Sequence, residues 1–119
     1  MMRDEVDAKW RALRTRFIAR LPERIADIEL HGAACASGDP RDALKTLFHI
    51  AHNLAGSGAT FGFDQLASAA REAEASIETA MKSAPPLAAA TAAHMADSLR
   101  HLTGVAASAV AAHSPGDRP

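Results

Sequence analysis

The sequence predicts an all-α protein, an up-down antiparallel four-helix bundle with an additional N-terminal helix. Apolar residues recur at steps of three and four along most of the 119 residues, whereas the alternation of β-branched and aromatic residues that marks strands is absent. Glycine, proline and aspartate gather in short segments between long helical stretches, and short connections favour antiparallel neighbours. Residues 1–113 are therefore expected to form one domain, and residues 114–119 a disordered polar tail.

Two helices are expected before residue 37. The first carries Val6, Trp10, Leu13 and Phe17 at steps of four, three and four, and ends near Leu21. Pro22 is then expected in the first turn of the second helix, where a missing N–H group is tolerated. The apolar face of that second helix consists of Leu21, Ile25, Ile28, Gly32 and Cys35.

Three further helices follow. The segment SGDP at 37–40 ends the second helix and starts a third, expected from about Pro40 to Thr60. At FGFD (61–64), Gly62 allows a tight turn and Asp64 is expected to cap the fourth helix, in which the run REAEASIE at 71–78 predicts a solvated face. After a loop at 82–86, the fifth helix begins near Leu87. The buried stripe of the fourth helix is expected to consist of Leu66, Ala70, Ala73, Ile77 and either Ala80 or Met81. The buried stripe of the fifth helix is expected to consist of Met95, Leu99, Leu102, Ala106 and Ala109.

Composition limits the possible partners and compartments. The net charge is −1 and charged residues make up 23% of the chain, which favours neither nucleic acid nor a membrane surface as a partner. The one cysteine, Cys35, has no partner for an internal disulfide, and the N-terminus lacks the apolar core of a signal peptide. We therefore expect a cytoplasmic protein, and the small, nearly neutral bundle suggests a monomer.

The third helix carries the candidate functional residue, His52. At about 100° per residue, its imidazole lies about 110° from the centre of the apolar stripe, on the shoulder between core and solvent. The stripe consists of Leu44, Leu47, Phe48, Ala51, Leu54, Ala55 and Gly58. Lys45, His49, Gly56 and Ala59 share the shoulder with His52.

Gly56 is unusual at that place, because glycine in a helix interior costs roughly 1 kcal/mol relative to alanine. It lies one turn after His52 and removes a side chain from beside an accessible imidazole. We interpret this as a hollow into which another protein surface docks. Gly58 falls in the apolar stripe, where close helix packing accounts for it.

An exposed imidazole is a nucleophile near neutral pH. No glycine-rich nucleotide loop, Ser/His/Asp set or pair of carboxylates lies near His52 in the sequence. One reaction needs little more than a well-placed imidazole: accepting a phosphoryl group from a partner that supplies the metal and the in-line geometry.

The segment HNLAGSGATFGF at 52–63, followed by LASAAREAEASIE at 66–78, resembles the histidine-containing phosphotransfer (HPt) domains of two-component signalling. The resemblance covers roughly residues 20–82, and the residues that match the family signature are Ala51, His52, Leu54, Gly56, Ser57 and Gly62. It implies a four-helix bundle in which His52 is the phosphoacceptor and Gly56 gives a receiver domain room to dock. The implied partners are a response-regulator receiver domain and a hybrid histidine kinase.

The resemblance also implies a phosphate carrier that has no ATP site and is not an enzyme. It needs no cofactor of its own, and Mg²⁺ is expected on the receiver. Many family members carry lysine three residues after the histidine, where this chain has Ala55. Lys45 and His49 are the residues expected to supply positive charge on the docking surface, together with the small residues Ala55, Gly56 and Ala59.

Two other functions stay open. The chain could be an interaction module that binds a receiver or kinase and sequesters it without transfer, which the absence of the lysine at 55 favours. Alternatively, His49 and His52, three residues apart on one helix face, could bind a metal ion or haem.

Overall fold

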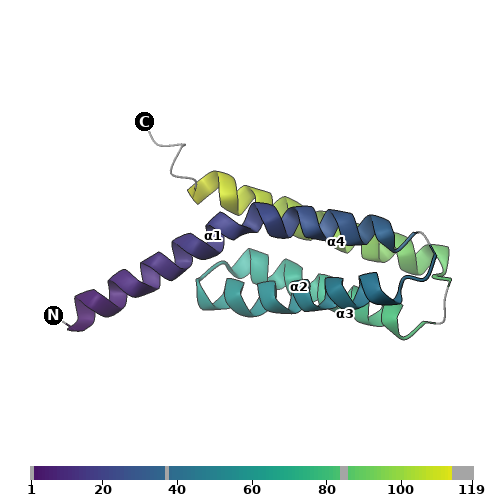
Figure 1. Cartoon of the computed structure of the whole chain (residues 1–119), viewed down its shortest axis with the longest axis horizontal. Coiled ribbons are helices and arrows are strands. Elements are labelled where there is room, and N and C mark those ends of the chain that lie inside the picture. The colour runs from purple at the N-terminus through teal and green to yellow at the C-terminus, as the bar shows by residue number, and fades with distance from the viewer. Residues whose placement is uncertain (1, 37, 84–85, 114–119) are drawn as a thin grey trace.

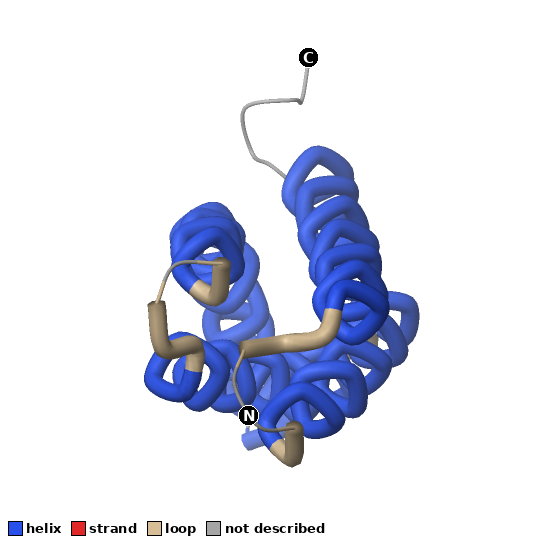
Figure 2. Tube along the Cα trace, turned by 90° about the vertical axis from the view of Figure 1, so that its right-hand side faces the viewer, coloured by secondary structure: helices blue, strands red, loops and turns tan. Residues whose placement is uncertain are grey.

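The computed structural model describes residues 2–36, 38–83 and 86–113, and the predicted tail at 114–119 lies outside them. This part of the chain forms four α-helices and no strand: α1 (Met2–Ala34), α2 (Arg41–Thr60), α3 (Asp64–Met81) and α4 (Ala89–His113). Consecutive helices pack against each other and α1 also packs against α4, whereas neither diagonal pair of helices brings Cα atoms within 8 Å of each other in the described residues. Figures 1 and 2 show the resulting bundle from the side and nearly end-on. The predicted helical bundle is confirmed.

The predicted boundary between a first and a second helix at Leu21 and Pro22 is wrong, because α1 continues through Pro22. A proline inside a helix costs roughly 3 kcal/mol, since it lacks the N–H that would bond the carbonyl of Ile18. Ile18, Leu21 and Ile28 are buried on both sides of Pro22. Burial contributes about 1.5–3 kcal/mol for each such side chain, which outweighs the proline penalty.

The N-terminal half of α1 is an arm that projects beyond the other helices, and α1 changes direction along its length (Figure 1). A proline is a frequent cause of such a bend. The apolar face predicted from spacing is largely exposed here: Val6 is 60%, Leu13 49% and Trp10 42% accessible. The segment expected to form an additional N-terminal helix is thus the first half of α1. It packs against the bundle only at the end of the segment that lies nearest the core.

Aromatic residues at the turn between α2 and α3 anchor this arm. The Phe61 ring lies 5.9 Å from that of Trp10 and 5.4 Å from that of Phe17, centroid to centroid. The Arg14 Nε–H donates to the Phe61 carbonyl at 3.1 Å, and its guanidinium lies 4.4 Å from the centre of the Phe63 ring. These contacts fix the arm at the end of α2 that follows the candidate site.

The turns are built largely as their sequences predict. Gly38 and Gly62 have positive φ values of 68° and 83°, a conformation that glycine adopts at little cost. The Asp39 carboxylate accepts the backbone N–H of Arg41 at 3.0 Å, immediately before α2. Asp64 makes no capping hydrogen bond, so its predicted role as an N-cap is wrong; it is the first residue of α3.

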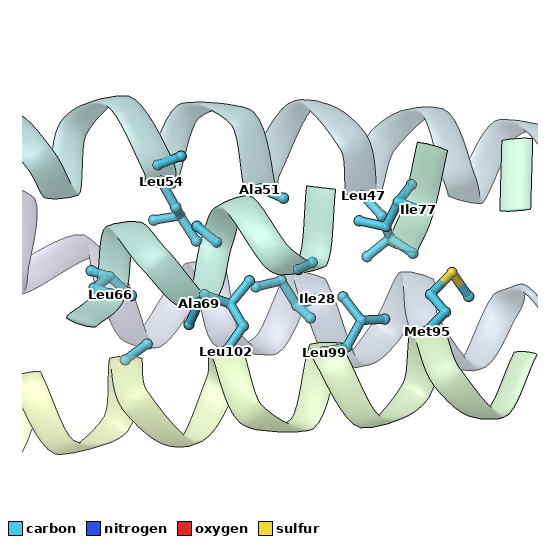
Figure 3. Close-up of a cluster of buried hydrophobic side chains, with 14 of the residues drawn as sticks. Ile28, Leu47, Ala51, Leu54, Leu66, Ala69, Ile77, Met95, Leu99 and Leu102 are labelled. Carbon is cyan, nitrogen blue, oxygen red and sulfur yellow. The ribbon is translucent and has the colours of Figure 1, made fainter. Parts of the chain in front are cut away.

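The core runs between the four helices and consists mainly of leucine, isoleucine and alanine (Figure 3). The predicted stripes of α3 and α4 are buried up to Ala106, and the choice at the end of α3 falls on Ala80, because Met81 is exposed. Alanines of α3 let the helices approach closely: a Cβ built on Gly58 of α2 would lie 3.3 Å from the backbone nitrogen of Ala67. The core thereby holds α2 and α3 in a fixed register beneath the candidate site.

Candidate functional site

His52 lies on the outer surface of α2, and its side chain is 64% exposed. The residues beside it in the sequence that face inward, Ala51 and Leu54, are buried in the core. Because successive residues of a helix are fixed in angle, this packing determines the direction in which His52 points. The predicted shoulder position is confirmed.

Glu74 of α3 holds the imidazole. Its Oε2 lies 3.1 Å from the His52 Nδ1, and its side chain is 23% exposed, so solvent screens this contact less than an open surface pair. An ionised carboxylate can only accept a hydrogen bond, so Nδ1 carries the proton and donates. In the neutral imidazole, Nε2 is then the nitrogen with a free lone pair, and the carboxylate favours the tautomer that makes Nε2 nucleophilic.

Phe48 adds a second restraint on the imidazole. Its ring is stacked on that of His52, with a centroid distance of 6.0 Å and an interplanar angle of 10°. Phe48 lies one turn before His52 on α2 and is half-buried against the core. The imidazole is thus restrained through its face and through Nδ1, and its side chain remains largely open to solvent.

The hollow predicted beside His52 is present. Gly56 is exposed, and a Cβ built on it would meet no atom within 4 Å apart from its own helix backbone and chain neighbours. Ala59, one turn further, is also exposed. Thr60 donates its hydroxyl hydrogen back to the Gly56 carbonyl at 2.9 Å, within α2. The surface of α2 from His52 towards the α2–α3 turn therefore carries little side-chain bulk.

The remaining predicted docking residues divide into two groups. Lys45 and His49 are exposed on the same side of α2, and His49 also lines the groove between α2 and α1. Ala55 is only 8% exposed and packs in the core cluster, as the helical wheel indicates. Its methyl group is thus turned into the core and contributes little to the surface that a partner would meet.

Sequence reasoning missed Glu74. It lies 22 residues after His52, within the run 71–78 that was expected to be a solvated face. Ser76 of the same run is buried and shares a 2.8 Å hydrogen bond with Ser98 of α4, so this run is only partly solvated. An antiparallel alignment of the two helices across the Gly62 turn is the signal that could have paired His52 with Glu74.

The acidic, histidine and cysteine side chains of the described residues form no cluster suited to a metal ion. Across residues 2–36, 38–83 and 86–113, no group of three or more His, Cys, Asp or Glu side chains is placed to hold a metal ion. Glu74 is the acidic residue that pairs with His52, and His49 takes no part in that pair. No helix in the described part of the chain is long and apolar enough to span a membrane.

The fold and the site together define a small four-helix bundle with an exposed histidine, His52, whose imidazole is held at Nδ1 by Glu74. Comparison with protein families identifies the family: the Hpt domain model matches residues 12–108, well over half of the chain. The chain belongs to the Hpt domain family, whose members act in histidine phosphotransfer with receivers and kinases of two-component phosphorelays. No curated protein and no solved structure matches the chain significantly.

Proposed function

We propose that this protein carries a phosphoryl group on the Nε2 atom of His52 and passes it between receiver-domain aspartates. The observation that carries the proposal is the contact between His52 Nδ1 and Glu74, which leaves Nε2 free while the side chain stays 64% exposed. Membership of the Hpt family supports it independently of that geometry. The proposal includes a monomeric protein that works in the cytoplasm.

The transfer needs only one bond to form and one to break. The Nε2 lone pair attacks the phosphorus of a receiver's aspartyl phosphate, and the P–O bond to the aspartate carboxylate breaks. The receiver supplies Mg²⁺ and the in-line arrangement, and this chain supplies a fixed imidazole. In the onward transfer to a second receiver, the P–N bond breaks and its electron pair returns to Nε2. The chain thus acts as a carrier, and it needs no ATP site of its own.

Glu74 is a positioning residue with an electrostatic effect. When Nε2 bonds to phosphorus, the ring keeps its Nδ1–H and gains positive charge, which the adjacent carboxylate stabilises. A hydrogen bond to a charged group contributes about 1.5–3 kcal/mol, and partial exposure reduces this to about 1–2 kcal/mol here. Glu74→Ala should therefore slow transfer by roughly tenfold, at about 1.4 kcal/mol per factor of ten.

Gly56 and Ala59 leave space for the receiver. In-line transfer requires the aspartyl phosphate to reach within bonding distance of Nε2, so the surfaces around both groups must touch. Gly56 permits this approach because it adds no side chain next to the imidazole. Lys45 and His49 lie on the opposite side of His52 along α2 and are available to acidic groups of the receiver.

The second candidate function is a module that binds a receiver or kinase without accepting phosphate. Ala55 favours it, because the position that carries lysine in many Hpt domains is here a small and nearly buried side chain. The test mixes the protein with phosphorylated receiver domains and follows acid-labile, base-stable label on this chain. We expect label on the wild type and on His101→Gln, an exposed histidine of α4, but none on His52→Gln. Receiver binding without label on the wild type would instead support the sequestering module.

A further inference from the structure

Arg71 on α3 is an exposed basic residue next to the candidate site. It belongs to the run 71–78, three residues before Glu74. Among the residues that the structure describes, no hydrogen bond or ion pair engages its guanidinium, whereas Glu74 is occupied by His52. A long cationic side chain is thus available on the helix that already supplies the partner of the imidazole.

Two contacts fix where Arg71 lies relative to α2. Glu74 faces His52, and Ala67 faces Gly58. Arg71 follows Ala67 by four residues and precedes Glu74 by three, and residues at these spacings share one side of a helix. Arg71 therefore lies on the side of α3 that flanks α2. The two helices are antiparallel, and Arg71 lies between Ala67 and Glu74 on α3 as Ala55 lies between Gly58 and His52 on α2. Arg71 is therefore level with Ala55 along the helix axes, beside Gly56.

Two positions of α2 between Arg71 and His52 carry little side-chain bulk on the surface. Gly56 has open space where a Cβ would be, and Ala55 turns its methyl group into the core. Lys45, the exposed lysine of α2, precedes His52 by seven residues, about 10 Å along a helix that rises 1.5 Å per residue. Arg71 is therefore the basic group that borders the Gly56 side of the imidazole.

We propose that the Arg71 guanidinium binds the phosphoryl group that Nε2 of His52 receives. This rests on the proposed function of His52. A guanidinium presents paired N–H donors that match phosphate oxygens, and it stays charged at every physiological pH. Arg71 on α3 thereby supplies the positive charge that a lysine at the position of Ala55 on α2 supplies in many family members. Arg71 forms no covalent bond, and it stabilises the negative charge on the phosphoryl oxygens during transfer and in the phosphorylated protein.

Phosphoramidate tests this without a partner protein. Nε2 attacks its phosphorus, the P–N bond breaks, and ammonia leaves after taking up a proton. We expect Arg71→Ala to label about tenfold more slowly than the wild type, and Arg71→Lys to label at an intermediate rate. Arg100→Ala is the matched control, because it removes the same charge from an exposed position on α4, the helix diagonal to α2. It should label at the wild-type rate.

Two further readouts separate phosphate binding from a structural effect. Raising the salt concentration should slow labelling of the wild type more than that of Arg71→Ala, since screening acts on the charge that the variant lacks. The phosphohistidine of Arg71→Ala should also show a shifted ³¹P resonance. Equal rates and equal salt dependence in the wild type and Arg71→Ala would overturn the assignment of Arg71 while leaving His52 in place. No label at His52 in the wild type would overturn both.

Discussion

The two glycines of α2 should respond in opposite ways to the same substitution. Gly56 lies in the exposed interior of the helix, and an added Cβ would meet nothing within 4 Å. Gly56→Ala should therefore gain the helix propensity of alanine, about 0.5–1 kcal/mol of unfolding free energy. For a domain of this size, this raises the melting temperature by roughly 2–6 °C.

Gly58→Ala gains the same helix propensity, but the added methyl group is crowded by the backbone of α3. Its Cβ would lie 3.3 Å from the backbone nitrogen of Ala67 and 3.5 Å from its Cα and Cβ, and backbone atoms cannot move aside without shifting α3. Overpacking of this kind costs about 1–3 kcal/mol, which exceeds the gain of about 1 kcal/mol. We expect a net loss of about 1 kcal/mol.

Chemical denaturation followed by far-UV circular dichroism measures both changes, and the labelling rate measures function. The more stable Gly56→Ala should still transfer phosphate more slowly than the wild type, and Gly56→Lys more slowly again, because each fills the hollow further. If the two alanine variants change stability by the same amount in the same direction, the distinction between an open and a packed glycine is refuted. If Gly56→Lys transfers normally, the hollow plays no part in docking.

Three other outcomes follow from the contacts described above. Leu102→Ala should lower the free energy of unfolding by about 2–5 kcal/mol in urea titrations, because Leu102 is fully buried; an effect below 1 kcal/mol would contradict that packing. Burial raises the pKa of the Cys35 thiol, so at pH 8 less thiolate forms and iodoacetamide should react more slowly with it than with a cysteine peptide, and equally fast in urea. The hydrogen bonds from Arg41 lower the pKa of Asp39 below 3.8, so the folding stability that they contribute is present at neutral pH and is lost as pH falls through the pKa of the folded state. Asp39→Ala should therefore lower the melting temperature at pH 7, and the difference from the wild type should shrink as the pH is lowered from 3.8.

The sequence predicted the parts of the site that depend on a single helix. The exposure of His52, the open position at Gly56 and the packed position at Gly58 all follow from helical period, and the structure confirms each of them. The turn at Gly62 was predictable for the same reason, because its positive φ is a local property that glycine tolerates.

Features that depend on how helices are aligned were not predictable in this way. Glu74 reaches His52 because of the register of α2 against α3, and the close approach of Gly58 to Ala67 belongs to the same register. The continuity of α1 through Pro22 was missed because local propensity favours a break there, and burial of residues on both sides overrides it. Spacing alone also could not tell that the arm at the start of α1 extends past the helices that would cover it.

The central claim is that phosphate binds Nε2 of His52 while Glu74 holds the proton on Nδ1. Long-range ¹H–¹⁵N correlation spectroscopy of the phosphoramidate-labelled protein identifies the nitrogen bonded to phosphorus and the nitrogen that carries the proton. We expect one phosphorylated histidine, His52, with phosphorus on Nε2 and a proton on Nδ1. Phosphate on Nδ1, or on any of the other histidines, would contradict it.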